Sequence, residues 1–311
     1  MSFSLNDKHI AIHYHYIEDP NPHTMGMNPC SVADFEQQIK FLSEHYRLTT
    51  IDEVFNAARD KKEEKICALT FDDGYKDQYK NAVPILKKYN AQGTFFIITQ
   101  TSAGILPSAH KVHIALSRLS PFEVIDAWNI FLAEKYPGLA ERFFIPKDRR
   151  LVPDRRLYAD VPSANIKEVF SAAGDDVRDA FLDSVFKQQH LNEKDLCQEM
   201  FMDTEEIRNL ERDGFVIGNH THSHRALSYL TEAQARDDFQ RARVWFTKIL
   251  KSQPTLFSYP YGLVPKWPED FLLKEGIDYA VTVEDRPIAA SDKPLLVPRY
   301  DMVWVRDFLK K

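Results

Sequence analysis

Residues 66–74 read ICALTFDDG, an apolar run that ends in two carboxylates and a glycine. The run is short and bounded by turn-forming residues, which predicts a buried β-strand over residues 66–71. Gly74 suits a sharp turn after the strand, because a residue without a Cβ adopts backbone conformations that other residues avoid. We therefore expect Asp72 and Asp73 to lie close together at the carboxyl end of a strand.

Six other strand-like runs alternate with helical patterns along the chain, at residues 10–17, 94–98, 215–218, 256–259, 279–283 and 295–299. Alternation of this kind predicts parallel strands joined by crossover helices, and hence an α/β barrel or an open sheet. Polar motifs occupy the ends of several runs, at residues 72–74, 218–224, 259–262 and 298–299. Barrel enzymes carry their active sites at the carboxyl ends of the strands, so we expect these motifs to meet there.

The segments between the strands have the period and the end signals of amphipathic helices. One apolar stripe at helical spacing consists of Val32, Phe35, Ile39 and Leu42. Capping-box spacing, in which two residues satisfy each other's backbone amides, occurs at Asp203 with Glu206 and at Thr231 with Gln234. We therefore expect helices directly after residues 203 and 231.

Residues 101–200 interrupt the alternation. A segment of this length is too long for a structureless loop in a compact domain, and residues 122–134 and 177–189 have helical patterns. We interpret it as a helical insertion beside the active-site mouth, with residues 1–100 and 201–311 forming the barrel. The insertion carries a group of arginines that suits either a clamp for phosphate or a solvated charged loop: Arg149, Arg150, Arg155 and Arg156.

Two further stretches, HTHSH at residues 220–224 and SYPYG at residues 258–262, combine with TFDDG into a candidate metal site. Catalytic zinc-type sites use about three protein ligands, usually imidazole and carboxylate, and keep one position open. Asp73, His220 and His224 supply these donors, and the spacing of the two histidines suits one face of a helical turn. Asp72 is left over, and a carboxylate beside a metal ion can act as the general base of a hydrolase. Alone, an Asp-Asp-Gly triplet is more often a surface turn, but the three motifs together favour the metal site.

These stretches resemble the signature motifs of the NodB-homology polysaccharide deacetylases, carbohydrate esterase family 4, over residues 10–99 and 202–300. The resemblance implies a distorted (β/α) barrel that removes N- or O-acetyl groups from sugars. It implies one divalent metal ion, zinc in the first place, with cobalt, nickel or manganese as alternatives. It also implies that Asp72 is the general base and that Asp73, His220 and His224 bind the metal. The backbone N–H of Tyr261 corresponds to the family's donor to the oxyanion of the tetrahedral intermediate.

Two departures from the family pattern concern the partner of Asp72 and the histidine that serves as the general acid. Many members carry an arginine at the position of Ser258, where it holds the catalytic aspartate, and many carry a Leu-His-Asp stretch near the C-terminus, which is missing here. One branch with a Tyr-Pro-Tyr-Gly third motif instead carries Pro-Arg on its last strand, and Pro298-Arg299 matches this branch. We hypothesise that Arg299 pairs with Asp72, which would favour its ionised form and fix its orientation. The alternative is an ordinary salt bridge at the barrel mouth.

The general acid is left open by the sequence. An amine leaving group must be protonated as the C–N bond breaks, so a proton donor is needed within reach. His15 is our candidate, since it shares one face of the first strand with His13 and follows Tyr14 as in the family. His222, a water on the metal and the protonated Asp72 are the alternatives.

Composition adds expectations about location and partners. A net charge of −6 over 311 residues lacks the basic character of a nucleic-acid-binding protein, and no apolar run approaches the ~20 residues of a membrane helix. The first residues show no secretory signal pattern, and three widely spaced cysteines do not suggest a disulfide framework. We therefore expect a cytoplasmic protein whose substrate is an amino sugar in a glycan precursor or an oligosaccharide. The sequence does not predict the oligomeric state.

Three functions fit these observations. The first is a metal-dependent hydrolase that removes an N-acetyl or N-formyl group from an amino sugar. The second is a catalytically impaired, carbohydrate-binding homologue, and the third is a non-haem iron oxygenase, because two histidines and one carboxylate also form such a site. The oxygenase gives Asp72 no role as a base, and an impaired homologue has no need of an intact Asp72. The sequence therefore favours the hydrolase.

Overall fold

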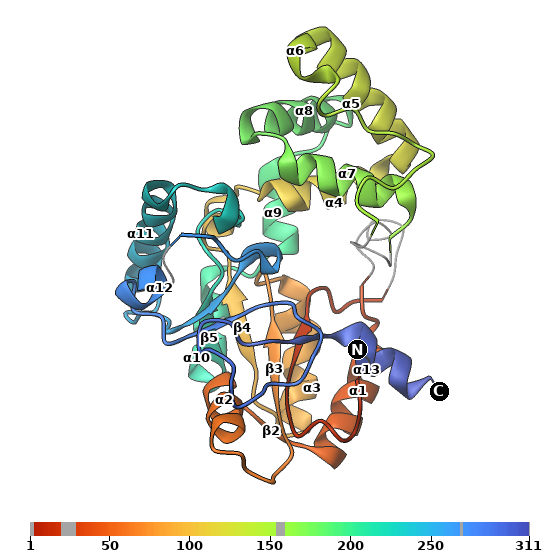
Figure 1. Ribbon diagram of the computed structural model, residues 1–311. Helices are drawn as coiled ribbons and strands as arrows, with labels where there is room; N and C mark the ends of the chain where they lie inside the picture. The colour runs from red at the N-terminus through yellow and green to blue at the C-terminus, as the bar shows by residue number, and fades with distance from the viewer. Residues whose placement is uncertain (1–2, 20–28, 154–158, 268–269, 311) are drawn as a thin grey trace. The chain divides into compact units, whose positions relative to one another are not determined.

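The computed structural model of the protein describes residues 3–19, 29–153, 159–267 and 270–310 (Figure 1). The chain divides into two compact units. The first contains the residues up to Asp19, Pro29–Ile105 and the chain from Cys197 onward, and the second contains Leu106–Leu196. The insertion was expected over residues 101–200, and the second unit spans Leu106–Leu196. The place of the insertion beside the active-site mouth stays a prediction.

The first unit is built on one sheet in which every described pairing is parallel. Its strands are β1 (His9–Tyr14), β2 (Arg47–Thr49), β3 (Ile66–Phe71), β4 (Thr94–Ile97), β5 (Val216–Asn219), β6 (Leu256–Ser258), β7 (Tyr279–Val281) and β8 (Tyr300–Asp301). The strand order is β7-β6-β5-β4-β3-β1-β8, with β2 paired to the first half of β3. The sheet curls into a half-barrel, and the expected distorted (β/α) barrel is confirmed.

Residues 297–301 join both edges of the curled sheet. Val297 pairs with Val281, the last residue of β7, and the two residues of β8 pair with Ile12 and His13 of β1. Arg299 lies between these two pairing points and is fully buried. The geometry of the closure therefore places this arginine among the carboxyl ends of the other strands.

The sheet is covered by the helices of the first unit. They are α1 (Val32–His45), α2 (Ile51–Arg59), the π-helix η2 (Gln78–Ala82), α3 (Val83–Lys88), α10 (Thr204–Arg212), α11 (Glu232–Ile249), α12 (Asp270–Lys274) and α13 (Met302–Leu309), with short 3-10 turns η3 (Thr99–Ala103), η4 (Leu227–Tyr229) and η5 (Pro260–Gly262). The predicted capping boxes are present at the starts of α10 and α11.

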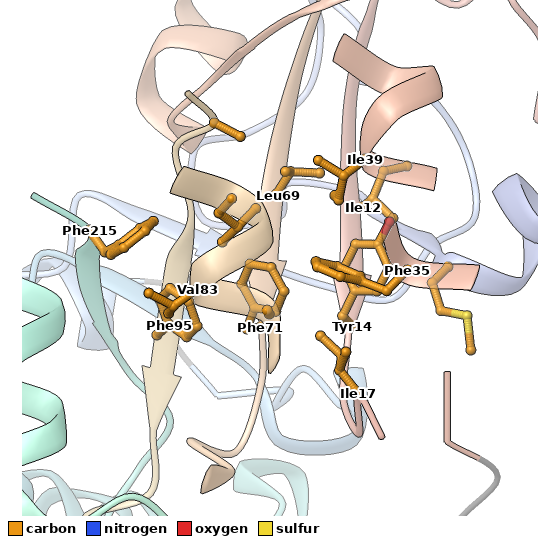
Figure 2. Close-up of a cluster of buried hydrophobic side chains, with 14 of the residues drawn as sticks. Ile12, Tyr14, Ile17, Phe35, Ile39, Leu69, Phe71, Val83, Phe95 and Phe215 are labelled. Atoms are coloured by element: carbon orange, nitrogen blue, oxygen red, sulfur yellow. The ribbon is translucent and has the colours of Figure 1, made fainter. Parts of the chain in front are cut away.

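Both faces of the strands are buried, which explains the nearly continuous apolar runs in the sequence. On the outer face, side chains of β1, β3 and β4 pack against α1 and α3 (Figure 2). This cluster includes Ile12, Tyr14, Phe35, Ile39, Leu69, Phe71, Val83 and Phe95. Alternate residues point to the opposite face, where they form a second cluster with α2 that includes Ala11, Ala68, Phe96, Val281 and Val297. Because successive side chains of a strand point to opposite faces, half of each apolar run packs against α1 and α3, and the other half fills the interior of the curled sheet.

Two predicted strands need correction, and one strand was missed. Residues 295–299 were expected to be the last strand, but the regular pairing with β1 is made by Tyr300 and Asp301, since residues 297–299 cross from one sheet edge to the other. The sequence analysis also missed β2, because three residues are too few for a recognisable alternation. The first strand ends at Tyr14, three residues before the expected end at residue 17.

The second unit consists of helices α4 (Ser108–Arg118), α5 (Pro121–Lys135), α6 (Pro137–Ala140), α7 (Val161–Ala172) and α8 (Asp175–Gln188), while α9 (Glu193–Met200) crosses its C-terminal boundary. The two helices expected in this segment correspond to α5 and α8. Trp128 of α5 is fully buried and contacts Phe170 of α7 and Phe181 of α8. Arg155 and Arg156 lie outside the described residues, so the phosphate clamp stays a prediction. Among the described helices of both units, none is long and apolar enough to cross a membrane.

Candidate functional site

The three predicted metal ligands lie together at the carboxyl ends of β3 and β5. The Nε2 atoms of His220 and His224 each stand 3.3 Å from Oδ1 of Asp73. One donor atom from each residue falls within 4.8 Å of the other two, and all three side chains are buried. One carboxylate and two imidazoles are the donor set of a catalytic zinc-type site. The residues therefore fit a single divalent ion.

The two histidines reach this arrangement through a loop. The segment after β5 is not helical, which corrects the expected helical turn, and Thr221 and His224 have positive φ angles of 69° and 58°. The loop is shaped by two local hydrogen bonds: Asn219 Oδ1 accepts from the N–H of Thr221, and Thr221 Oγ1 accepts from the N–H of His224, both at 2.8 Å. The spacing of four residues thus brings the imidazoles together by a different backbone path.

Neighbouring groups orient the ring of His220 and favour a cation beside it. Nδ1 of His220 lies 2.8 Å from the carbonyl oxygen of Ser258. Since a carbonyl can only accept, Nδ1 carries the hydrogen and Nε2 offers its lone pair toward Asp73. Burial lowers the pKa of His220, but the hydrogen bond to Asp73 and the charges of Asp72 and Asp73 outweigh it and raise the pKa overall. The site therefore carries negative charge that suits a bound cation.

Asp72, the leftover carboxylate, is held by Arg299. Nη1 of Arg299 donates to Oδ1 of Asp72 and Nη2 donates to Oδ2, both at 2.8 Å, and the Ser258 hydroxyl donates to Oδ2 at 3.2 Å. Burial alone would raise the pKa of the Asp72 carboxyl, but the charge and the hydrogen bonds of Arg299 hold it well below its ordinary value. Asp72 is thus ionised at neutral pH and fixed in orientation.

Every hydrogen-bonding direction of the Arg299 guanidinium is used inside the barrel. Besides Asp72, it donates to the hydroxyls of Thr70 and Ser258 at 3.0 Å and to the carbonyl of Thr282 at 2.9 Å. Its central carbon lies 5.7 Å from the centre of the Phe96 ring. The pairing with Asp72 proposed from the sequence is therefore present, in a buried network and not at a solvated mouth. Ser258, the residue at the family's usual arginine position, now joins Arg299 to Asp72.

The candidate acids differ in their surroundings. His15 is solvent-exposed at the end of β1, and its ring lies 5.4 Å from that of His13. Burial lowers the pKa of His13 to about 4, so this residue is neutral at pH 7. His222 is turned toward Thr99, whose hydroxyl lies 2.8 Å from Nδ1, and burial lowers its pKa. Of these three histidines, His15 is the one that is solvent-exposed, and its role as the acid stays a prediction.

Tyr261, within the third motif, lies beside the histidine ligands. Its ring centre lies 4.9 Å from that of His224, and its backbone has a positive φ of 60°. Asp73 has a φ of 77° and Thr221 and His224 share this region of backbone space, which L-residues rarely adopt. All three motifs thus contain strained backbone, as is common where a site must be held in one geometry.

Gln78 is a site residue that the sequence analysis missed. Its side-chain amide donates to the carbonyl of Asp72 at 2.6 Å and to the carbonyl of His15 at 2.9 Å. It thereby ties the end of β3 to the segment that carries His15, and it is fully buried. A glutamine in a helical pattern gives no signal of such a contact, since its partners are backbone atoms of two strands.

Known proteins resemble the chain in sequence. The family model for polysaccharide deacetylases matches residues 59–112 and 166–280, together more than half of the chain. The poly-β-1,6-N-acetyl-D-glucosamine N-deacetylase of Staphylococcus aureus is 20% identical over 271 residues, which cover 86% of this chain and 66% of the relative. The Bacillus subtilis protein YxkH is 37% identical over 84 residues, which cover 26% of this chain and 28% of the relative. The matches thus span less than two thirds of the length of either relative.

Solved structures share the fold at low sequence identity. IcaB from Ammonifex degensii superposes with a TM-score of 0.59 at 17% identity, over 97% of this chain and 95% of that one. The deacetylase PplD of Streptococcus pyogenes superposes with a TM-score of 0.57 at 16% identity, over 94% and 91% of the two chains.

Proposed function

Because the chain belongs to the polysaccharide deacetylase family, we propose that it is a metal-dependent hydrolase that removes an N-acetyl or N-formyl group from an amino sugar. The substrate we propose is a glycan precursor or an oligosaccharide. One observation carries the proposal: an ionised, oriented Asp72 stands directly beside the Asp73–His220–His224 donor set. A base next to a Lewis-acid site is what amide hydrolysis requires.

Asp73, His220 and His224 would hold the ion, and zinc is the metal we propose. A divalent ion there would polarise the substrate carbonyl and bring the pKa of a water toward neutrality. Asp72 takes the proton from the attacking water, and its low pKa keeps it ready for this role over the neutral range. Arg299 keeps the carboxylate from rotating away, since both of its oxygens are engaged.

Two further groups complete the proposed reaction. The backbone N–H of Tyr261 donates to the oxyanion that forms when the carbonyl is attacked, a contribution of about 3 kcal/mol in comparable sites. His15 protonates the amine as the C–N bond breaks, which its exposed position at the end of β1 supports. Gln78 contributes indirectly by fixing the backbone of both Asp72 and His15.

The choice of an amino sugar is supported by the names of the relatives, several of which are N-deacetylases of an N-acetylglucosamine polymer. A catalytically impaired, sugar-binding homologue is the alternative function. It is disfavoured because the buried Arg299 keeps Asp72 ionised, as a general base requires, and all five of its N–H groups are already bonded within the barrel, which leaves none for a sugar. The cytoplasmic location stays a prediction.

The decisive test is release of acetate or formate from N-acylated amino sugars by the purified protein. We expect activity that disappears with a chelator, returns with zinc or cobalt, and falls by about 10²- to 10⁴-fold in Asp72→Asn. Binding of the sugars without any acid release, in the presence of metal, would instead identify the impaired homologue. Release that persists after complete metal removal would overturn the metal-dependent mechanism.

A further inference from the structure

The loop between the two histidine ligands, residues 220–224, is held along one edge by backbone contacts. The N–H of Thr99 donates to the carbonyl of Thr221 at 3.2 Å, and the N–H of Gln100 donates to the carbonyl of His222 at 3.0 Å. These bonds secure the carbonyl side of the loop only. The N–H groups of the same loop point the other way and need acceptors of their own.

Those acceptors are the two oxygens of a single carboxylate, Asp238. Oδ2 of Asp238 accepts from the N–H of His222 at 2.7 Å, and Oδ1 accepts from the N–H of Ser223 at 3.1 Å and from the Ser223 hydroxyl. Asp238 comes from helix α11 and is only 7% exposed. A buried carboxylate is costly unless its charge is met by hydrogen bonds, and here all three donors come from the ligand loop.

We propose that Asp238 is a positioning residue that sets the geometry of the metal ligands His220 and His224. This inference rests on the metal site of the proposed function and extends it to a residue outside all three motifs. The backbone between the ligands is in an unfavourable left-handed conformation at Thr221 and His224, so it persists only while the surroundings impose it. Without Asp238, the N–H groups of His222 and Ser223 lose their acceptors and the loop relaxes. Both Nε2 atoms then lose their fixed distance to Asp73.

The neighbouring residue Asp237 supplies a matched control. Its side chain is 64% exposed and pairs with Arg241 on the same helix at 2.9 Å, away from the loop's N–H groups. Asp238→Asn and Asp237→Asn remove the same charge from adjacent positions. A general weakening of cation attraction would lower the zinc affinity without changing the ligand geometry, whereas loss of loop geometry would also change the cobalt spectrum, and only in Asp238→Asn.

The experiment measures zinc binding to the metal-stripped protein by calorimetry, and the visible absorption spectrum of the cobalt-loaded protein. Outer-sphere partners of metal ligands commonly change metal affinity by about 10- to 100-fold. We expect the zinc Kd of Asp238→Asn to rise by that factor and its cobalt spectrum to change. Asp237→Asn should stay within about twofold of the wild type. Ser223→Ala removes one of the three donors and serves if Asp238→Asn does not fold, with an expected smaller rise in Kd.

The outcomes separate the two proposals. Equal zinc affinity and equal cobalt spectra in Asp238→Asn and Asp237→Asn would overturn the positioning role while leaving the metal site intact. The same holds for Ser223→Ala if it is the variant measured and binds zinc like the wild type. A wild-type protein that binds neither ion would overturn the metal site itself, and the positioning role with it.

Discussion

Replacement of Arg299 by methionine tests the central electrostatic feature of the site. The substitution keeps a long, unbranched side chain but removes the positive charge and all five hydrogen bonds of the guanidinium. Asp72 is 3% exposed in the wild type, and among the described residues the Ser258 hydroxyl is the side-chain hydrogen-bond partner that would remain to it. Removing one partner of a buried ion pair costs about 3–5 kcal/mol, because the other charge remains buried without compensation.

The same loss raises the pKa of Asp72. One pKa unit corresponds to about 1.4 kcal/mol, so a loss of about 3 kcal/mol raises the pKa by about two units. In the wild type the folded-state pKa lies below the ordinary value, so this carboxylate stabilises the fold fully above pH ~4, and the contribution is lost as the pH falls through the folded-state pKa. In Arg299→Met, burial raises the pKa of Asp72 and no guanidinium lowers it. The difference in unfolding free energy between the two proteins should therefore be largest at neutral pH and narrow toward acid.

Two measurements check this reasoning: urea unfolding from pH 7 downward, and the acid limb of the pH profile of kcat/KM, which reports the base in the free enzyme. We expect Arg299→Met to lose about 3–5 kcal/mol of unfolding free energy at pH 7 and its acid limb to rise by about two pH units. Arg286 is the control, because it also forms a bidentate pair, with Asp292, but its side chain is 29% exposed. Arg286→Met should cost about 1 kcal/mol or less and leave the acid limb in place.

The double variant Asp72→Asn with Arg299→Met removes both charges and sharpens the test. It should recover part of the stability lost in Arg299→Met while remaining inactive, since no unpaired carboxylate is left behind. An unchanged unfolding free energy and an unmoved acid limb in Arg299→Met would refute the claim that Arg299 keeps Asp72 ionised.

Three further predictions concern the base, the acid and the core. Asp72→Asn should lower turnover by about 10²- to 10⁴-fold and leave the zinc affinity unchanged, whereas Asp73→Asn should lower both. Calorimetry for zinc binding and an acetate-release assay for turnover separate the two roles. His15→Gln should lower turnover on an N-acetyl sugar strongly but barely affect 4-nitrophenyl acetate, whose leaving group needs no proton, and equal losses on both substrates would rule out His15 as the acid. Gly218→Ala should destabilise the protein by about 1–3 kcal/mol in thermal unfolding, because a Cβ there would stand 2.3 Å from Cδ1 of Phe96, while Gly138→Ala, with open space around it, should cost nothing.

The metal-ligand set could be predicted because its members are local in sequence. Asp72 and Asp73 are adjacent after one strand, and His220 and His224 follow another, so it remained only to infer that the ends of these two strands lie close together. This follows from parallel strands with crossover helices, because they place all carboxyl ends on one side of the sheet. The conformation of the histidine loop was predicted wrongly, since a spacing of four is compatible with a helical turn and with the strained loop that the protein adopts.

The sequence by itself therefore determined the strand and helix pattern, the barrel class, the donor set for a metal and the presence of a spare carboxylate. Only the tertiary structure decided what holds these groups. The pairing of Arg299 with Asp72, 227 residues apart, was hypothesised from the sequence, but its burial and its full set of hydrogen bonds were not. Gln78 joins the ends of two strands, and Asp238 reaches the ligand loop from a helix; neither contact was predicted. Such contacts depend on the curl of the sheet and on where its last strand crosses between the two edges, which no local pattern of residues encodes. The motifs specify which side chains can bind a metal or act as a base, whereas the ionisation and orientation of these side chains follow from the closure of the barrel around them.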